Sequence, residues 1–166
     1  MINLYYSNIR RRCQMSLSEN LTQVFDRTLD SFKTVIPIEF TFDQPRLYTE
    51  KLTNVSYGVL IMLTGDIRGQ LIIQGERHAF QHIGEMMFGM QLEGEMLQSF
   101  TGELGNMIAG TLSSKVAGSG INMDITPPDV LSEQQKEFHL MHRLHTPVYL
   151  KDTMHMQIIM ELEEAS

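Results

Sequence analysis

Three polar residues, Ser99, Glu103 and Asn106, follow one another at helical spacing in the second half of the chain. At about 100° per residue they fall on one side of a helix, together with Gly110. A carboxylate and a carboxamide one turn apart offer a negative charge and a group that both donates and accepts hydrogen bonds. We predict that this polar stripe carries the function, and that Ser99 takes part in binding a partner.

The helix that holds this stripe contains an unusual number of glycines. Gly102, Gly105 and Gly110 lie inside it, and a glycine in a helix interior costs about 0.5–1 kcal/mol relative to alanine. Small residues beside Glu103 and Asn106 let another backbone or a bulky group come close to those two side chains. We therefore expect Gly102 and Gly110 to belong to a partner-binding surface.

The other side of the same helix is apolar and is expected to pack against the core. Its residues fall within about one third of the helix circumference. They are Leu97, Phe100, Leu104, Met107, Ile108 and Leu112. The helix is predicted from about Glu95 to Ala117, because Gly118 and Gly120 are a usual C-terminal signal.

Composition indicates one globular domain with an acidic surface. A chain of 166 residues with 42% hydrophobic and 20% charged content can bury one full core. Three of its 13 lysines and arginines lie in the first fourteen residues, which contain no acid, so the rest carries 10 basic against 20 acidic residues. An acidic body repels nucleic acid and anionic membranes, and we expect it to bind neither.

The N-terminus is predicted to be a flexible basic tail, residues 1–14, ahead of a single domain at residues 15–166. It contains three consecutive arginines and lacks the apolar segment of a secretory signal. The chain has no apolar run of 18 residues, so we expect no membrane span. Cys13 is the single cysteine, which excludes an intramolecular disulfide and favours the cytoplasm.

Hydrophobic periodicity predicts the remaining elements. A first amphipathic helix starts after Ser18 and ends before Pro37, and a second covers Glu76 to Gly89. In the second helix, we expect four residues to face inward: Phe80, Ile83, Met87 and Phe88. Extended segments are predicted at residues 36–43, 55–64, 70–74, 121–126, 146–150 and 154–162, with 55–64 and 70–74 forming a hairpin.

The order of these elements suggests an internal repeat. A helix followed by three strands occurs over residues 17–74 and again over residues 95–162, although only fragments such as Gln70-Leu-Ile-Ile and Gln157-Ile-Ile correspond in sequence. We predict an α+β fold of two pseudo-symmetric α-β-β-β halves, with the long helices on one face of a mostly antiparallel sheet. A strand at residues 154–162 that ends the sheet would offer an edge for pairing across a two-fold axis.

The spacing Ser99-x3-Glu103-x2-Asn106, on a helix followed by a strand and then by Pro127 or Pro128, resembles the CheC/CheX/FliY family of chemotaxis phosphatases. The family's motif is Ser/Asp-x3-Glu-x2-Asn with a proline some two dozen residues further on. In this chain the proline comes one or two positions early. The resemblance covers residues 17–162 and is strongest for CheX-type members.

The number of motifs separates the types within this family. CheC-type members carry one motif on each long helix, whereas CheX-type members carry a single motif. The first helix here offers Glu19-x2-Thr22 and a second acidic spacing that begins at Asp26, and neither includes the asparagine. The chain therefore has the one-site pattern.

The resemblance implies a phosphatase that hydrolyses the aspartyl phosphate of a CheY-like response regulator. The regulator itself supplies Mg²⁺ and a lysine, so no cofactor is expected on this chain. Asn106 would hold a water molecule in line with the P–O bond, and Glu103 would dock by pairing with the regulator's lysine. The single-motif relatives also imply a homodimer.

Two other functions stay open at this stage. The same helix would serve a non-catalytic module that binds a phosphorylated regulator or a flagellar-switch component without hydrolysis. Histidines at helical and three-residue spacing, His78 and His82 together with His139, His142 and His145, would suit a zinc-binding sensor. Because no acids accompany them at ligand spacing, we expect no metal site.

Overall fold

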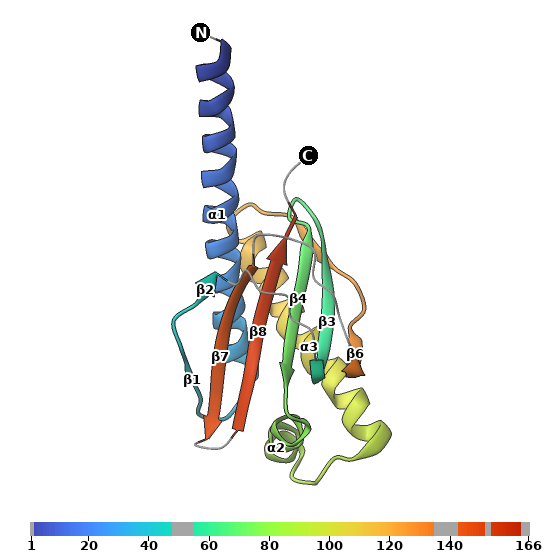
Figure 1. The fold of residues 1–166 in the computed structure, drawn as a ribbon. Helices are drawn as coiled ribbons and strands as arrows, with labels where there is room; N and C mark the ends of the chain where they lie inside the picture. The colour runs from blue at the N-terminus through green and yellow to red at the C-terminus, as the bar shows by residue number, and fades with distance from the viewer. Residues whose placement is uncertain (1, 48–54, 135–142, 152–153, 164–166) are drawn as a thin grey trace.

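The computed structural model describes residues 2–47, 55–134, 143–151 and 154–163. Within them, three helices and eight strands follow one another along the chain (Figure 1). The helices are α1 (Ile2–Val35), α2 (Arg77–Phe88) and α3 (Gly94–Ala117). The strands are β1 (Thr41–Phe42), β2 (Arg46–Leu47), β3 (Val55–Gly65), β4 (Gly69–Gly75), β5 (Met123–Ile125), β6 (Asp129–Gln134), β7 (Arg143–Lys151) and β8 (Met154–Leu162).

All eight strands belong to one antiparallel sheet with the order β1-β7-β8-β4-β3-β5. The short strand β2 also pairs with β7, and β6 also pairs with β3. The two hairpins, β3–β4 and β7–β8, meet along the ladder between β4 and β8. Each half of the chain therefore contributes one hairpin to the centre and places its short strands against the hairpin of the other half.

The ladder between β4 and β8 shows the predicted repeat at the level of side chains. Gln74 donates a hydrogen bond to Gln157 across it at 2.9 Å, and Gln70 donates one to Glu161. Both pairs join residues that are opposite each other in the register of the two strands. If Gln70 corresponds to Gln157, then Gln74 corresponds to Glu161, and the two contacts are equivalent positions of the two halves. The predicted α+β fold of two pseudo-symmetric halves is therefore confirmed.

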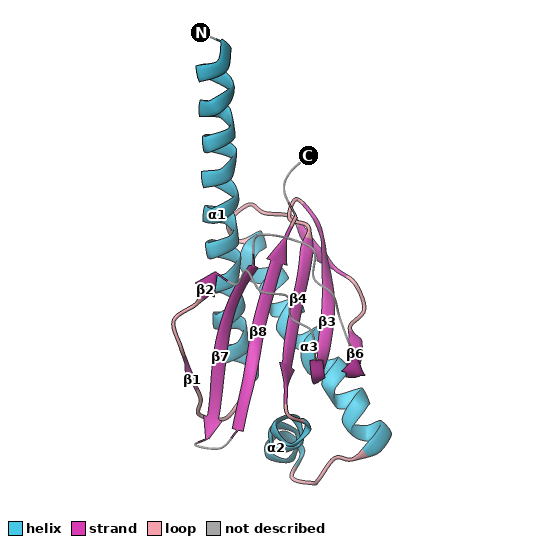
Figure 2. Ribbon diagram, viewed as in Figure 1, coloured by secondary structure: helices cyan, strands magenta, loops and turns pink. Residues whose placement is uncertain are grey.

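The long helices α1 and α3 pack against each other on one face of the sheet, and α2 lies at one end of it (Figure 2). This packing follows from alternation in the strands, because every second residue of β3 and β4 points to the helices. Ile61, Leu71 and Ile73 belong to this main core, which continues into both long helices. Leu60 and Ile72 point the other way and belong to a second, smaller cluster.

The structure differs from the sequence prediction at the N-terminus. Helix α1 begins at Ile2, so residues 2–14 are helical where a flexible tail is predicted, and the N-terminal part of the helix extends beyond the sheet (Figure 1). The helix ends at Val35, two residues before Pro37, as predicted. A proline disfavours helical geometry in the residue before it and lacks a backbone N–H, which accounts for that end.

Three strands also differ from their prediction. Strand β2, at Arg46–Leu47, is absent from the prediction, and together with β6 it gives each half four strands after its long helix instead of the predicted three. Strand β8 is not a sheet edge, because it lies between β7 and β4, and six of its nine residues are buried. Strand β6, at Asp129–Gln134, is absent from the prediction because its sequence is polar and follows two prolines. Hydrogen bonding to β3 holds these residues in a strand, although their composition does not favour one.

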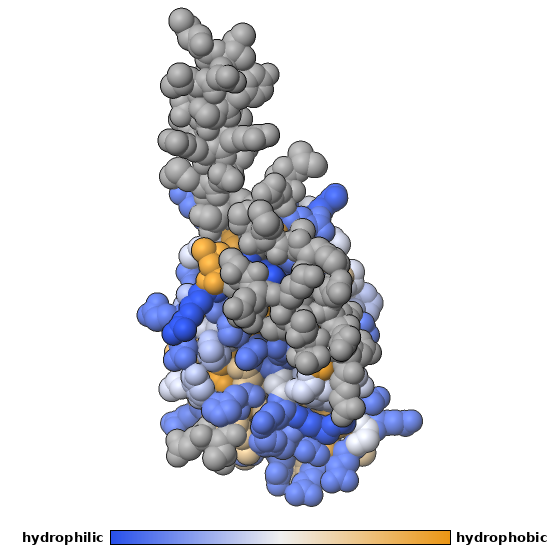
Figure 3. Space-filling view, in the orientation of Figure 1, coloured by the Kyte–Doolittle hydropathy of each residue, from blue (hydrophilic) through white to orange (hydrophobic). Residues whose placement is uncertain are grey.

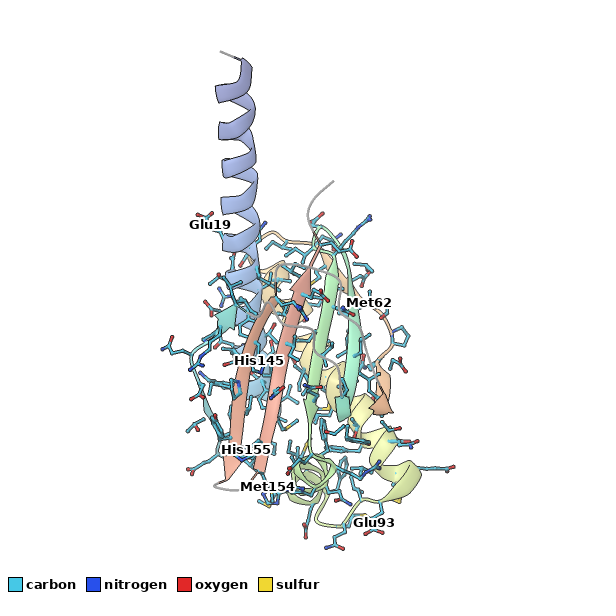
Figure 4. The ribbon with its side chains drawn as sticks, viewed as in Figure 1. Glu19, Met62, Glu93, His145, Met154 and His155 are labelled. Carbon is cyan, nitrogen blue, oxygen red and sulfur yellow. The ribbon has the colours of Figure 1, made fainter. Side chains whose placement is uncertain are left out.

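Hydrophilic side chains predominate among the described residues on the sheet side of the molecule (Figure 3). Met62 of β3 and His145 of β7 lie on this side (Figure 4). None of the helices in the described ranges has a stretch long and apolar enough to cross a membrane.

Candidate functional site

Helix α3 carries the predicted site, and its boundaries match the prediction to within one residue. Glu93 is its N-cap residue in extended conformation, and Glu95 lies in the first turn, where a carboxylate interacts favourably with the helix dipole. Glu93 lies in the segment that joins α2 to α3 (Figure 4). Gly89 ends α2 in the left-handed conformation, with φ 70°, and starts this segment.

Hydrogen bonds hold α3 on the sheet at both ends. The Thr101 hydroxyl donates to the carbonyl of Leu97 at 2.8 Å and lies 2.9 Å from the Tyr57 hydroxyl of β3. Since a hydroxyl has one proton to donate, Tyr57 is the donor to Thr101. Near the other end, the Ser113 hydroxyl donates to the carbonyl of Met123 in β5 at 2.7 Å. These contacts fix the rotation of α3, and therefore the direction of its outer face.

Gly105 allows α3 to approach β3 closely. A Cβ atom placed on this buried glycine would lie 2.8 Å and 2.9 Å from the two methyl carbons of Val59, closer than carbon atoms pack. Gly102 is half-buried, and its nearest neighbour in that direction is a Val130 methyl at 3.5 Å. Gly110, also half-buried, has open space beyond it. Of these three glycines of α3, only Gly105 thus has a packing reason inside the molecule.

Glu103, Asn106 and Ser99 are all exposed on α3. By helix geometry, Asn106 lies about 60° further round the axis than Glu103, with Ser99 between the two directions. Gly110 lies between Glu103 and Ser99 in the same projection. The structure therefore brings the predicted stripe together on one solvent-facing strip, with no large side chain of the helix between the carboxylate and the carboxamide.

A groove of about 490 Å³ runs beside this strip, between α3 and the end of α2. Ser99 and Glu103 contribute to its wall. The remaining lining residues are Met87, Phe88, Met90, Leu92, Glu95, Met96, Phe100, Leu104 and Met107. The predicted polar stripe is thus one border of a mostly apolar hollow, which no local pattern in the sequence indicates.

Two residues predicted to face the core instead line this groove. Met107 is 39% exposed, because it lies about 20° beyond Phe100 at the margin of the buried arc of α3. Phe88 is 62% exposed because α2 ends immediately after it at Gly89, and its ring contacts Phe100 edge-on. Met96, predicted at the border of the polar stripe, does lie there and is exposed.

The histidines do not form a metal site in the part of the chain that the structure describes, where no group of three potential ligands converges. His78 lies 3.1 Å from Glu76, and both side chains are about half exposed. Burial lowers the pKa of His145 and outweighs the opposing effect of its hydrogen bond with Gln157. His139 and His142 lie outside the described residues.

Pro127 and Pro128 connect β5 to β6. This connection places β6 next to α3, where Val130 contacts the position of Gly102. Along the chain, the short strand β5 lies between the end of α3 and both prolines.

The fold is an antiparallel sheet made of two related halves with two long helices. In the described residues, only α3 carries the solvent-facing strip of Ser99, Glu103, Asn106 and Gly110, called here the Glu/Asn strip. This combination has the one-site pattern of the family that the sequence resembles. Comparison with known proteins gives the family: residues 57–155 match the model of the chemotaxis phosphatase CheX. The chain belongs to this CheX family.

A relative agrees with that assignment, and two solved structures share the fold. The chain is 32% identical over 129 residues to the CheY-P phosphatase CheX of Thermotoga maritima, an alignment covering 74% of this chain and 83% of the relative. The CheX crystal structure from Vibrio vulnificus has a TM-score of 0.75 at 22% identity and covers 85% of this chain and 99% of its own. A chain in the CheX–CheY–BeF₃–Mg²⁺ complex from Borrelia burgdorferi has a TM-score of 0.72 at 20% identity, covering 84% and 97%.

Proposed function

We propose that this protein hydrolyses the aspartyl phosphate of a CheY-like response regulator, with Asn106 positioning the attacking water and Glu103 docking to a lysine of the regulator. The observation that carries the proposal is the exposed Glu103/Asn106 strip on a helix held firmly to the sheet. The name of the Thermotoga relative, a CheY-P phosphatase, supports the same substrate class. The single cysteine is what supports a cytoplasmic location.

The proposed reaction needs little from this chain. An acyl phosphate is labile, and a Mg²⁺ ion held by the regulator would neutralise the phosphoryl oxygens, so the missing part is a water molecule aligned with the P–O bond. The Asn106 carboxamide can accept a hydrogen bond from that water and donate another to a phosphoryl oxygen. Because a carboxamide does not titrate, it does this without depending on pH.

Glu103 is suited to docking. Its exposed carboxylate lies about one turn from Asn106, so an ion pair with the regulator's lysine would fix both the depth and the angle at which Asn106 enters. Docking excludes water from this pair, which strengthens it relative to an ordinary surface ion pair. Gly110, with open space beyond it, leaves room for the approaching surface. Gly102 adds no side chain to the same part of the helix.

Phosphate release from an acyl-phosphorylated regulator tests the proposal. Each CheY-like regulator of the source organism is phosphorylated with a small phosphodonor, and its loss of phosphate is followed with and without this protein. We expect at least one regulator to lose phosphate faster by about 100-fold when the protein is saturating, the size of effect that a well-placed hydrogen-bonding group provides. Decay at the spontaneous rate despite complex formation would instead identify a docking module without hydrolysis.

We also propose that the protein forms a homodimer. Strand β8 cannot supply the dimer contact because it is paired on both sides, so the available sheet edges in the described residues are those of β1 with β2 and of β5 with β6. Pairing of one such edge across a two-fold axis would satisfy its free backbone groups. Sedimentation at micromolar concentration is expected to give twice the mass of 19.1 kDa, and a monomer would contradict the proposal.

A further inference from the structure

Exposed large apolar side chains gather at one place on the molecule. In the described part of the chain, seven such side chains are exposed, and four of them line the groove between α2 and α3. These four are Phe88, Met90, Met96 and Met107. Apolar side chains scattered singly are normal on a protein surface, but a contiguous apolar patch with a polar border marks a binding surface.

The groove has the shape and lining of a receptor for side chains. Its volume of about 490 Å³ exceeds that of a single large side chain, and its wall includes the buried residues Leu92, Phe100 and Leu104. Methionine is unbranched and flexible, so its side chains adapt to the shape of an inserted group. Burial of one aromatic or large aliphatic side chain there would stabilise a complex substantially.

The polar groups of the lining are few and bear one sign of charge. Glu95, Ser99 and Glu103 are the lining residues with polar side chains, and no lysine, arginine or histidine lines the hollow. Two carboxylates and one hydroxyl favour basic residues in whatever binds there. An apolar group with positive charge beside it is therefore the complement of this groove.

Glu103 belongs to the groove and to the Glu/Asn strip at once. Around the axis of α3, Met107 and Met96 come first, followed by Glu103, and Asn106 lies further on in the same direction. A partner that reaches Asn106 while pairing with Glu103 therefore covers the rim of the groove. The apolar hollow and the proposed site are parts of one continuous surface.

We infer that this groove receives an apolar side chain of the phosphorylated response regulator, flanked by basic residues, while Glu103 and Asn106 reach the regulator's phosphorylation site. The inference rests on the proposed function, and it adds an apolar contact that contributes to the affinity for the regulator beside the ion pair of Glu103. Asn106 acts on the phosphoryl group, whereas Met90 and Met96 act only on binding.

Charge and polarity argue against other occupants of the groove. In a symmetric contact between two copies of this chain, Glu95 and Glu103 of one copy would face the same two carboxylates of the other. A small-molecule pocket buries most of its ligand's surface, whereas this groove is open to solvent along its border with the Glu/Asn strip. A basic and apolar surface of a protein partner has neither difficulty.

The test uses the double variant Met90→Gln/Met96→Gln in the full chain. Glutamine has nearly the length and helix propensity of methionine but cannot supply an apolar surface. Binding is measured by calorimetric titration with the regulator loaded with beryllofluoride and Mg²⁺, and hydrolysis is measured with the phosphorylated regulator. We expect Kd and KM to rise about tenfold, as for residues at the centre of an interface, while kcat stays within about twofold.

Met86→Gln is the matched control. Met86 is 57% exposed on α2 and does not line the groove, whereas Met96 is 54% exposed and does. The control is expected to bind and hydrolyse like the native protein. Native affinity in the double variant would overturn the inference, as would a change of its sedimentation mass, which would assign the groove to contact between copies. Loss of a small molecule that co-purifies with the native protein, with regulator binding unchanged, would also overturn it.

The two readouts separate this inference from the proposed function. The beryllofluoride complex does not require hydrolysis, so weaker binding by the double variant supports the groove even if the native protein does not speed phosphate release. Fast hydrolysis with unchanged binding by the double variant overturns the inference alone. A native protein that binds none of the regulators overturns both.

Discussion

Replacing Asn106 with alanine is expected to lower kcat for regulator dephosphorylation by about 100-fold, which is the usual effect of removing one placed hydrogen-bonding group. Asn106 is exposed on α3 and, by the proposal, touches only the water and the phosphoryl group. Its loss therefore removes an interaction of the transition state and leaves docking intact. Single-turnover decay of the phosphorylated regulator measures the rate, and titration with the beryllofluoride form measures the affinity.

Gln98→Ala is the control for this variant. Gln98 is also an exposed carboxamide on α3, but helix geometry places it on a different side from Asn106. It is expected to keep the native rate. In contrast, Glu103→Gln removes the docking charge and keeps a hydrogen-bonding group. It is expected to lower the affinity for the regulator and to make that affinity less sensitive to salt. Native activity in Asn106→Ala would refute the role of Asn106.

Replacing Gly105 with alanine is expected to destabilise the protein by about 1–3 kcal/mol, the usual cost of overpacking a core. The added Cβ would meet both methyl carbons of Val59 at less than 3 Å, so α3 has to move away from β3. This cost exceeds the gain of about 0.5–1 kcal/mol that alanine normally brings in a helix. Urea unfolding, compared at constant slope, measures the difference.

Gly102→Ala on the same helix should have the opposite sign. A Cβ atom there would lie 3.5 Å from Val130, which is an ordinary contact, so the substitution keeps the gain in helix propensity. The pair of variants separates close packing from helix propensity. A Gly105→Ala variant as stable as Gly102→Ala would show that the tight contact between α3 and β3 does not limit stability.

The helix and its polar strip could be predicted from sequence because the signals are local. The apolar residues of α3 recur at 3.6-residue spacing, and the polar residues fall between them, so the exposed side of Glu103 follows from periodicity alone. The boundary of the buried arc does not follow from periodicity, since it depends on what packs beside the helix. Met107 lies at that boundary, and the predicted inward orientation was wrong because the groove leaves it uncovered.

Features that depend on distant pairing escaped prediction. Only Val130 and Leu131 favour a strand among the six residues 129–134, and β6 forms because it pairs with the edge of β3. Strand β8 was wrongly predicted as an edge, because which strands pair with it on either side is not encoded in its own nine residues. The groove was missed for the same reason, because it arises only when the end of α2 comes next to α3.

The arrangement of the short strands has a consequence for how the two halves depend on each other. Strands β1 and β2 belong to the first half of the chain but border the hairpin of the second, and β5 and β6 do the reverse. Without the other half, the hairpin that remains would have no partner strand on either of its two sides, and both sides would expose unpaired backbone groups. Neither half is thus a self-sufficient folding unit, and any evolutionary change that weakens the half without the Glu/Asn strip also loosens the support under it.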